Sequence, residues 1–216
     1  MNNLYIFDLD GTLIDSSDQI LEALNFTLNR NGLPIQERSE IFPLIGLPPA
    51  RFLSKLDLSE VQIANLITEF RARLLEISIE GVIFYPGAVE LLAYLKQRGD
   101  YISVATNKPT GLAGDILRET EVWPYLDYLV GSDGIRPKPA PDMLEKILQN
   151  FDRRGIYPDR FFMIGDRNED IESGLQVSAS CIFIEHSGHK LSTESITDGT
   201  VSFQTLWDYY KFILLE

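Results

Sequence analysis

Apolar positions along the chain follow two alternating patterns, which predict strands and helices in turn. Short runs that are mainly apolar suit strands, and they occupy residues 4–7, 101–105, 125–130, 160–164 and 181–184. The first of them is apolar throughout, as expected for a strand buried on both faces. Between these runs, apolar residues recur every three or four positions, as on one face of a helix. The predicted helices begin near residues 17, 36, 48, 59, 88, 112, 143, 171 and 203.

This alternation predicts an α/β fold with a Rossmann-like parallel sheet and helices on both faces. The segment from residue 15 to 82 contains helical patterns only and is too long for a single crossover helix. We therefore expect an inserted small all-helical cap domain at 15–82, above the carboxyl edge of the sheet. The α/β core domain is expected at 1–14 and 83–216.

Composition and charge limit the classes of partner. The chain has 216 residues, of which 44% are hydrophobic and 24% charged, as in ordinary globular proteins. Its net charge of -13 argues against nucleic acid or an anionic membrane as a partner. We expect a cytoplasmic protein that is a monomer or a homodimer. The aromatic final helix packs on the sheet or forms a dimer contact, and Cys181, the single cysteine, suits a buried core position.

Polar side chains follow the first predicted strand directly. Asp8 and Asp10 end the apolar run at 4–7, and period two places both carboxylates on the same side of an extended backbone. Gly11 permits a sharp turn or a close ligand approach immediately after them. Taken alone, the two aspartates are also compatible with an ordinary solvated turn.

Two later strands end in the same way. Thr106 and Asn107 follow the run at 101–105, and Asp166 follows the run at 160–164. Three prolines between residues 137 and 141 hold Lys138 in an extended segment. Because parallel strands present their carboxyl ends at one edge, these side chains are expected to converge with the first aspartates.

A cluster of three carboxylates, a hydroxyl, an amide and an ammonium has a defined chemistry. Carboxylates repel one another unless a cation or proton neutralises them, and a set of hard oxygen ligands suits Mg²⁺. A carboxylate nucleophile beside Mg²⁺, with cationic and hydroxyl groups for anionic oxygens, is suited to phosphoryl transfer.

With these motifs the chain resembles the haloacid dehalogenase superfamily of aspartate-nucleophile phosphohydrolases. Four motifs appear in the family's order: D-x-D-G-T at Asp8–Thr12, the strand-end Thr106, Lys138, and G-D-x-x-x-D at Gly165–Asp170. The resemblance covers nearly the whole chain, and a helical insert between the first two motifs matches the position of the family's cap.

The resemblance implies a role for each motif residue. Asp8 attacks the substrate phosphorus and forms an aspartyl-phosphate, while Asp10 protonates the leaving oxygen and then deprotonates the hydrolytic water. Thr106 and Asn107 bind phosphoryl oxygens, and Lys138 offsets charge on the nucleophile and the phosphate.

The same resemblance implies a magnesium site. Asp8, the backbone carbonyl of Asp10, and Asp166 are the expected ligands. Asp170 is expected to act from outside the ligand set, through water or through Lys138.

Within the family, Asp10 favours phosphatases and phosphomutases over ion-pumping ATPases and dehalogenases. The segment at 45–48 and the Tyr-Pro-Gly turn at 85–87 resemble the phosphoglycolate phosphatase-like branch. A cap loop supplies specificity in that branch, which makes Gly46 and Arg51 candidates for substrate contact. Arg51 also suits a solvated surface charge. Lys108 suits either an anionic substrate tail or a solvated strand end.

Several polar residues fit no motif. Arg167 stands where the branch more often has serine, and it is expected to reach the phosphate or to pair with Glu169. His186 and His189 are spaced like metal ligands but have no third nitrogen or sulfur partner, which favours ordinary loop residues.

Together these features predict a Mg²⁺-dependent phosphatase acting on a small phosphorylated metabolite, either phosphoglycolate-like or a sugar phosphate, through an aspartyl-phosphate. Two alternatives are a sugar phosphomutase of the same family and a catalytically idle protein that binds a phosphorylated ligand. Thr12 favours hydrolysis over mutase activity, and the four intact motifs argue against an idle protein.

Overall fold

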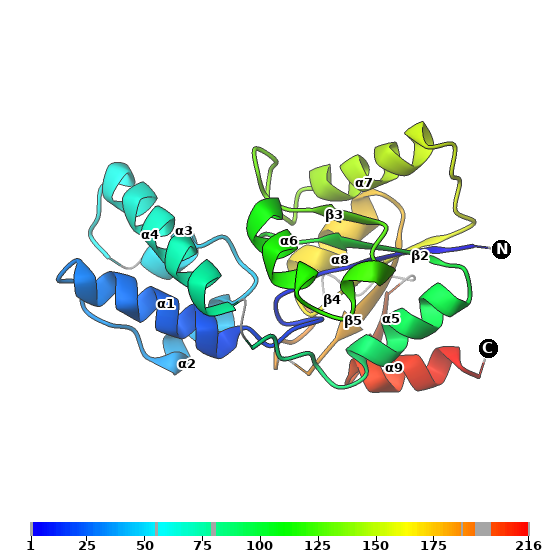
Figure 1. The fold of residues 1–216 in the computed structure, drawn as a ribbon, viewed down its shortest axis with the longest axis horizontal. Helices are drawn as coiled ribbons and strands as arrows, with labels where there is room; N and C mark the ends of the chain where they lie inside the picture. The colour runs from blue at the N-terminus through cyan, green and yellow to red at the C-terminus, as the bar shows by residue number, and fades with distance from the viewer. Residues whose placement is uncertain (1, 55, 79–80, 187, 193–199, 216) are drawn as a thin grey trace.

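The computed structural model describes residues 2–54, 56–78, 81–186, 188–192 and 200–215. It contains a six-stranded sheet with helices on both faces and, at one end, a separate group of helices (Figure 1). Both chain termini lie at the opposite end of the molecule (Figure 1). No helix in the described ranges is long and apolar enough to cross a membrane.

The sheet is parallel throughout and has the order β3-β2-β1-β4-β5-β6. The first strand lies in the middle, paired with β2 and β4, which explains why all its residues are buried. This confirms the predicted α/β fold. The strands are β1 Leu4–Phe7, β2 Tyr101–Ala105, β3 Tyr128–Val130, β4 Phe161–Gly165, β5 Ser180–Ile184 and β6 Thr200–Phe203.

Each face of the sheet packs on its own set of helices because side chains alternate along a strand. Tyr5 and Phe7 of β1 belong to one apolar cluster, and Leu4 and Ile6 belong to the other. The first cluster involves α5 Ala88–Gln97, α6 Thr110–Arg118 and α9 Leu206–Ile213, and the second α7 Asp142–Arg153 and α8 Asn168–Gln176.

The helices between β1 and α5 form a group with a core of their own, here called the helical insert (residues 17–78). Its buried residues include Leu24, Phe52, Phe70 and Leu74, which join facing helices. Figure 1 shows this group beside the sheet rather than on either face. Its elements are α1 Ser17–Arg30, α2 Arg38–Ile41, the 3-10 helix η1 Phe42–Leu44, α3 Ala50–Leu53 and α4 Glu60–Ser78.

Three local predictions are corrected. The sixth strand, β6, was not predicted, because Thr200–Phe203 is a short and partly exposed edge strand without an apolar run. The run at 125–130 forms a strand only from residue 128, since a 3-10 helix, η2 Trp123–Tyr125, occupies its start. The helix expected from residue 36 up to Pro43 is shorter: α2 covers Arg38–Ile41, and the 3-10 helix η1, which contains Pro43 near its first position, follows it.

Candidate active site

The carboxyl ends of the three central strands bring the motif residues together. Strand β1 is in register with both neighbours, since Phe7 pairs with Val104 of β2 and with Ile164 of β4. The backbone N–H of Asp8 continues the ladder by donating to the carbonyl of Ile164, at 2.9 Å. The aspartates, the strand-end threonine and the later acidic motif therefore emerge from adjacent strand ends.

Lys138 forms a buried ion pair with two of the carboxylates. Its Nζ lies 2.6 Å from Oδ1 of Asp8, 2.6 Å from Oδ1 of Asp170, and 2.7 Å from the carbonyl of Ala105. Three acceptors thus match the three N–H groups of the ammonium. The ammonium is committed to holding Asp8 and Asp170 in place, which orients the Asp8 carboxylate at the strand end.

The electrostatics of this group show an excess of negative charge. Burial raises the pKa of Asp8 well above its usual value; Lys138 opposes this, while Asp170 and Asp166 add to it. Burial also raises the pKa of Asp170. Burial alone would lower the pKa of Lys138, but the carboxylates of Asp170 and Asp8 outweigh it and hold the pKa above its usual value. The single positive charge of Lys138 therefore does not neutralise the combined negative charge of the neighbouring carboxylates.

These carboxylates fit a divalent cation. One oxygen from each of Asp8, Asp166 and Asp170 lies within 4.8 Å of the others, and all three residues are buried. Carboxylate oxygens crowded in a buried site are hard ligands that need positive charge, which Mg²⁺ supplies. Asp170, expected outside the ligand set, lies geometrically inside this cluster.

Asp166 is held from two sides. Its Oδ1 accepts a hydrogen bond from the hydroxyl of Thr12 at 2.8 Å, and its Oδ2 lies 2.7 Å from Nδ1 of His189. The turn at Gly11 also lies against this carboxylate: φ at Gly11 is +89°, and a Cβ there would come within 2.5 Å of Oδ2 of Asp166. Only glycine fits at this point, both for its backbone angle and for its lack of a side chain.

Asp10 lies at the border between the sheet edge and the helical insert. Its Oδ1 accepts from the hydroxyl of Ser16 at 2.5 Å and from Nζ of Lys108 at 2.7 Å. Lys108 is buried, so the solvated strand-end alternative for this lysine is wrong. The carboxylate expected to move a proton is thus oriented by one hydroxyl and one ammonium.

Asn107 links the helical insert to the loop that carries the lysine. Its Nδ2 donates to the carbonyl of Gly46 at 2.9 Å, and its Oδ1 accepts from the backbone N–H of Lys138 at 3.0 Å. The neighbouring hydroxyl of Thr106 accepts from the backbone N–H of Lys108 at 3.1 Å. The side chains of Asn107 and Thr106 are therefore both fixed by hydrogen bonds to backbone groups at the sheet edge.

Arg167, which follows the sheet strand β4, forms hydrogen bonds to the helical insert. Its Nη1 donates to the carbonyls of Pro43 at 3.0 Å and Ile45 at 2.8 Å, and its Nε pairs with Glu169 at 3.3 Å. The pairing with Glu169 agrees with one of the two sequence expectations. The contacts with the insert were not foreseen.

The two histidines lie in the loop after β5, but that loop reaches the site. His186 donates from Nε2 to the carbonyl of Gly11 at 3.0 Å and stacks on Tyr85 with ring centroids 3.7 Å apart. Burial lowers the pKa of His186 below its usual value, which favours the neutral ring. Nε2 of His189 lies 3.0 Å from Nη1 of Arg167, which favours the tautomer with the proton on Nδ1, toward Asp166.

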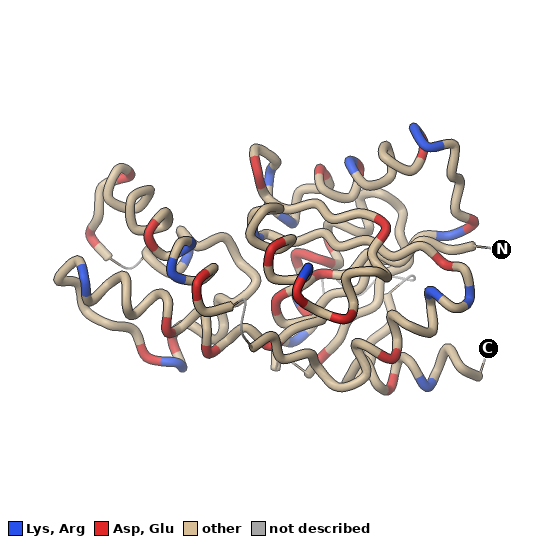
Figure 2. The backbone as a smooth tube through the Cα atoms, in the orientation of Figure 1, with Lys and Arg blue, Asp and Glu red and all other residues tan. Residues whose placement is uncertain are grey.

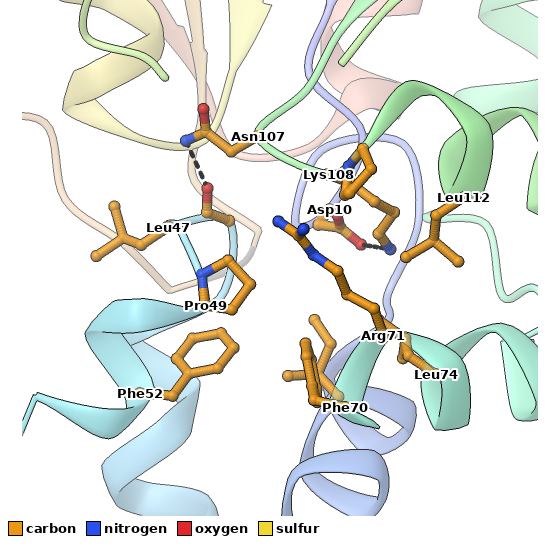
Figure 3. Close-up of a pocket in the computed structure, with 13 residues that line it drawn as sticks. Asp10, Leu47, Pro49, Phe52, Phe70, Arg71, Leu74, Asn107, Lys108 and Leu112 are labelled. Atoms are coloured by element: carbon orange, nitrogen blue, oxygen red, sulfur yellow. Dashed lines mark hydrogen bonds and ion pairs between the residues drawn. The ribbon is translucent and has the colours of Figure 1, made fainter. Parts of the chain in front are cut away.

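The candidates for substrate contact in the helical insert separate into two groups. Gly46 lines a cavity between the insert and the sheet edge, together with Asp10 and Lys108. Arg51 is exposed and is not among the lining residues. Arg71 of α4 lines the cavity instead (Figure 3). The signal for it was its spacing from Ile67 and Leu74, which puts position 71 on the apolar side of that helix.

The charged residues in the described part of the chain do not form a basic surface that could attract an anion (Figure 2). Lys and Arg are interspersed with Asp and Glu along both parts of the molecule (Figure 2). With a net charge of -13, an anionic ligand must be met by individual cations at the site rather than by a basic surface.

The chain is similar to known proteins along most of its length. A family model described as haloacid dehalogenase-like hydrolase matches residues 5–184. The chain is 30% identical over 183 residues to the pyrophosphatase PpaX of Bacillus mycoides, covering 84% of this chain and 83% of that protein. It is 28% identical over 225 residues to the phosphoglycolate phosphatase of Rhodospirillum rubrum, covering 98% and 92%.

A solved structure extends the similarity to three dimensions. The crystal structure described as a predicted phosphatase from Clostridium acetobutylicum aligns with a TM-score of 0.81 and 27% identity, and 100% of each chain is covered. The similarity therefore includes the helical insert as well as the sheet.

Proposed function

The chain belongs to the haloacid dehalogenase-like hydrolase family, and from that premise we propose that it is a Mg²⁺-dependent phosphatase of small phosphorylated metabolites. The relatives' names point to phosphoglycolate-like or pyrophosphate-like substrates. In this proposal residues 15–82 act as a cap domain over a core of 1–14 and 83–216.

The observation that carries the proposal is the buried contact of Lys138 with Asp8 and Asp170, at 2.6 Å each. An ion pair that leaves excess carboxylate charge is costly for stability unless a cation is bound. The same ion pair suits a nucleophilic carboxylate, because it fixes the orientation of Asp8 in a buried site. Mg²⁺, held by Asp8, Asp166 and either Asp170 or the Asp10 carbonyl, would offset charge on the phosphoryl oxygens.

The proposed reaction has two displacements at phosphorus. An oxygen of Asp8 forms a bond to phosphorus while the bond to the leaving oxygen breaks, and Asp10 gives that oxygen a proton. Water then attacks the aspartyl-phosphate, Asp10 takes its proton, and the bond between phosphorus and Asp8 breaks. Ser16 and Lys108, both on Oδ1 of Asp10, keep this carboxyl in position.

The test is phosphate release from a panel of phosphoglycolate, pyrophosphate and hexose phosphates, with Mg²⁺ and with a chelator. Asp8→Asn is expected to lower kcat by at least ~10³-fold, as for loss of other nucleophiles. Asp115→Asn makes the same change at a half-exposed surface ion pair of α6 and should leave kcat unchanged. Rapid quench and mass spectrometry should find one phosphoryl group on the wild-type chain.

Three results would count against parts of the proposal. Phosphate release that persists in Asp8→Asn would contradict the aspartyl-phosphate intermediate. Full activity in the presence of a chelator would contradict the dependence on Mg²⁺. Conversion of a hexose phosphate to its positional isomer without phosphate release would replace hydrolysis with phosphoryl transfer between sugar positions.

A further inference from the structure

The cavity between the helical insert and the sheet edge has two kinds of wall. Polar groups from Asp10, Asn107 and Lys108 line the end formed by the sheet edge. Most other lining side chains are apolar and come mainly from the insert: Ile20, Leu47, Pro49, Phe52, Phe70, Leu74 and Leu112.

Arg71 is the charged side chain that the insert adds to these walls. It extends from α4 among Phe70 and Leu74 toward the end of the cavity where Asp10 and Lys108 lie (Figure 3). Its Nε is buried, and no hydrogen-bond partner lies near that atom in the part of the chain that the structure describes. A buried donor of a cationic group without a partner costs free energy, so this position is unfavourable until an acceptor arrives.

Arg73, two positions further along the same helix, is the natural contrast. Its guanidinium pairs with Glu22 at 2.6 Å and with Glu76 at 3.1 Å on the surface of the insert. The helix thus has one arginine neutralised by its own chain and one directed into the cavity. The difference cannot come from helix propensity, which is the same for both.

We propose that Arg71 binds a second anionic group on the leaving group of the substrate, and that the part joining this group to the ester is apolar. This inference rests on the proposed phosphatase function. The transferred phosphate belongs at the sheet edge beside Asp8, so Arg71, on the insert, meets the distal end of the molecule. Hydroxyl groups along the apolar wall would lose water without gaining partners, which disfavours a sugar there.

The second anion is a carboxylate or a phosphate, since either accepts hydrogen bonds from a guanidinium. The substrate class is therefore a phosphate monoester with an aliphatic or aromatic body and an anionic end. This class is narrower than small phosphorylated metabolites in general.

The test uses alkyl phosphates of two to five carbons with three different ends: methyl, carboxylate or phosphate. Wild-type kcat/KM is expected to favour an anionic end over methyl by roughly 10- to 100-fold at the best length. Arg71→Gln should remove that preference by lowering kcat/KM for the anionic ends to about the level of the methyl series, and Arg71→Lys should keep part of it. Arg73→Gln is the matched control and should behave as wild type.

The carboxylate and phosphate arms show which anion is preferred. Equal kcat/KM for methyl and anionic ends in the wild type would overturn the inference. So would an Arg71→Gln effect of equal size on all series. Glucose 6-phosphate turned over better than every alkyl compound would overturn the apolar part.

Failure of the proposed function is recognised separately, because the methyl series reports hydrolysis without a second anion. Calorimetry with Mg²⁺-loaded Asp8→Asn measures binding without turnover. Tighter binding of anionic than methyl ends, abolished in Asp8→Asn/Arg71→Gln, would support the role of Arg71 even if nothing is hydrolysed. Equal binding of both ends would refute it.

Discussion

Replacing Arg167 tests whether the contact between the helical insert and the sheet edge controls substrate binding. This residue directly follows Asp166, yet its guanidinium donates to the carbonyls of Pro43 and Ile45. Its side chain is 13% exposed, and the bond to the carbonyl of Ile45 is partly buried. We expect Arg167→Gln to loosen the η1 loop and to weaken substrate binding more than it slows chemistry.

The magnitude follows from the bonds that are lost. Hydrogen bonds to a charged group contribute about 1.5–3 kcal/mol each, and the lower end applies where water replaces them on opening. Two such bonds amount to about 3 kcal/mol. Glutamine keeps at most one weaker bond, so the loss is about 2 kcal/mol, or roughly 30-fold in the equilibrium between closed and open loop. The pair with Glu169 is longer, at 3.3 Å, and adds less.

Hydrogen exchange and kinetics measure this loss independently. The amides of Ile45 and Leu47 donate within the loop, to Phe42 and Leu44, and should exchange up to ~30-fold faster in Arg167→Gln. kcat/KM should fall by up to about the same factor, mainly through KM. Mg²⁺ affinity, measured in parallel, reports any disturbance of the neighbouring metal ligand.

Arg136→Gln is the control, because Arg136 is an exposed arginine that pairs with Asp142. It should change neither loop exchange nor KM. The reasoning would be refuted if Arg167→Gln left the loop amides protected and KM unchanged, or if Arg136→Gln produced the same effects.

Three further predictions concern the carboxylate cluster. Gly11→Ala should weaken Mg²⁺ binding at least ~10-fold, since its Cβ would displace Asp166; unchanged calorimetric affinity would contradict this. The pKa of Asp8 is higher in the folded protein than its usual value of 3.8, so folding favours the protonated carboxyl. The stability that this group contributes is therefore complete below pH 3.8 and is lost as the pH rises through the raised pKa. Metal-free Asp8→Asn should therefore be more stable than wild type at neutral pH, with the difference vanishing near pH 4 or with Mg²⁺; urea titrations that show a constant difference would refute it. Lys138→Met should destabilise the fold by about 3–5 kcal/mol, because Asp8 and Asp170 lose their shared cation; a loss below about 1 kcal/mol in the same titrations would refute that estimate.

Features carried by local patterns were predictable from the sequence. The boundaries of α5, Ala88–Gln97, match the prediction because a Tyr-Pro-Gly turn precedes it and Gly99 follows it. The parallel sheet follows from short apolar runs alternating with helices, and the convergence of the acidic motifs follows from that topology. Strand β6 was missed because pairing with β5, rather than its own sequence, makes it a strand.

The residues of the site likewise fall into those that the local sequence predicts and those that only the fold brings together. Asp8, Asp10, Lys138 and Asp166 were foreseeable because each stands at a strand end or between prolines, which are features of the local chain. Contacts across the gap between insert and sheet were not foreseeable, since they join residues distant in sequence.

Arg51 and Arg71 illustrate that limit. Both arginines lie in segments that the sequence predicts to be helical. The packing of the insert against the sheet edge directs Arg71 into the cavity, whereas Arg51 is exposed. Lys108 was equally ambiguous until the fold buried it against Asp10. The sequence by itself thus determined the fold class and the chemistry at the strand ends. The tertiary structure decided which cations face the substrate, because the direction of a side chain depends on how separate elements pack.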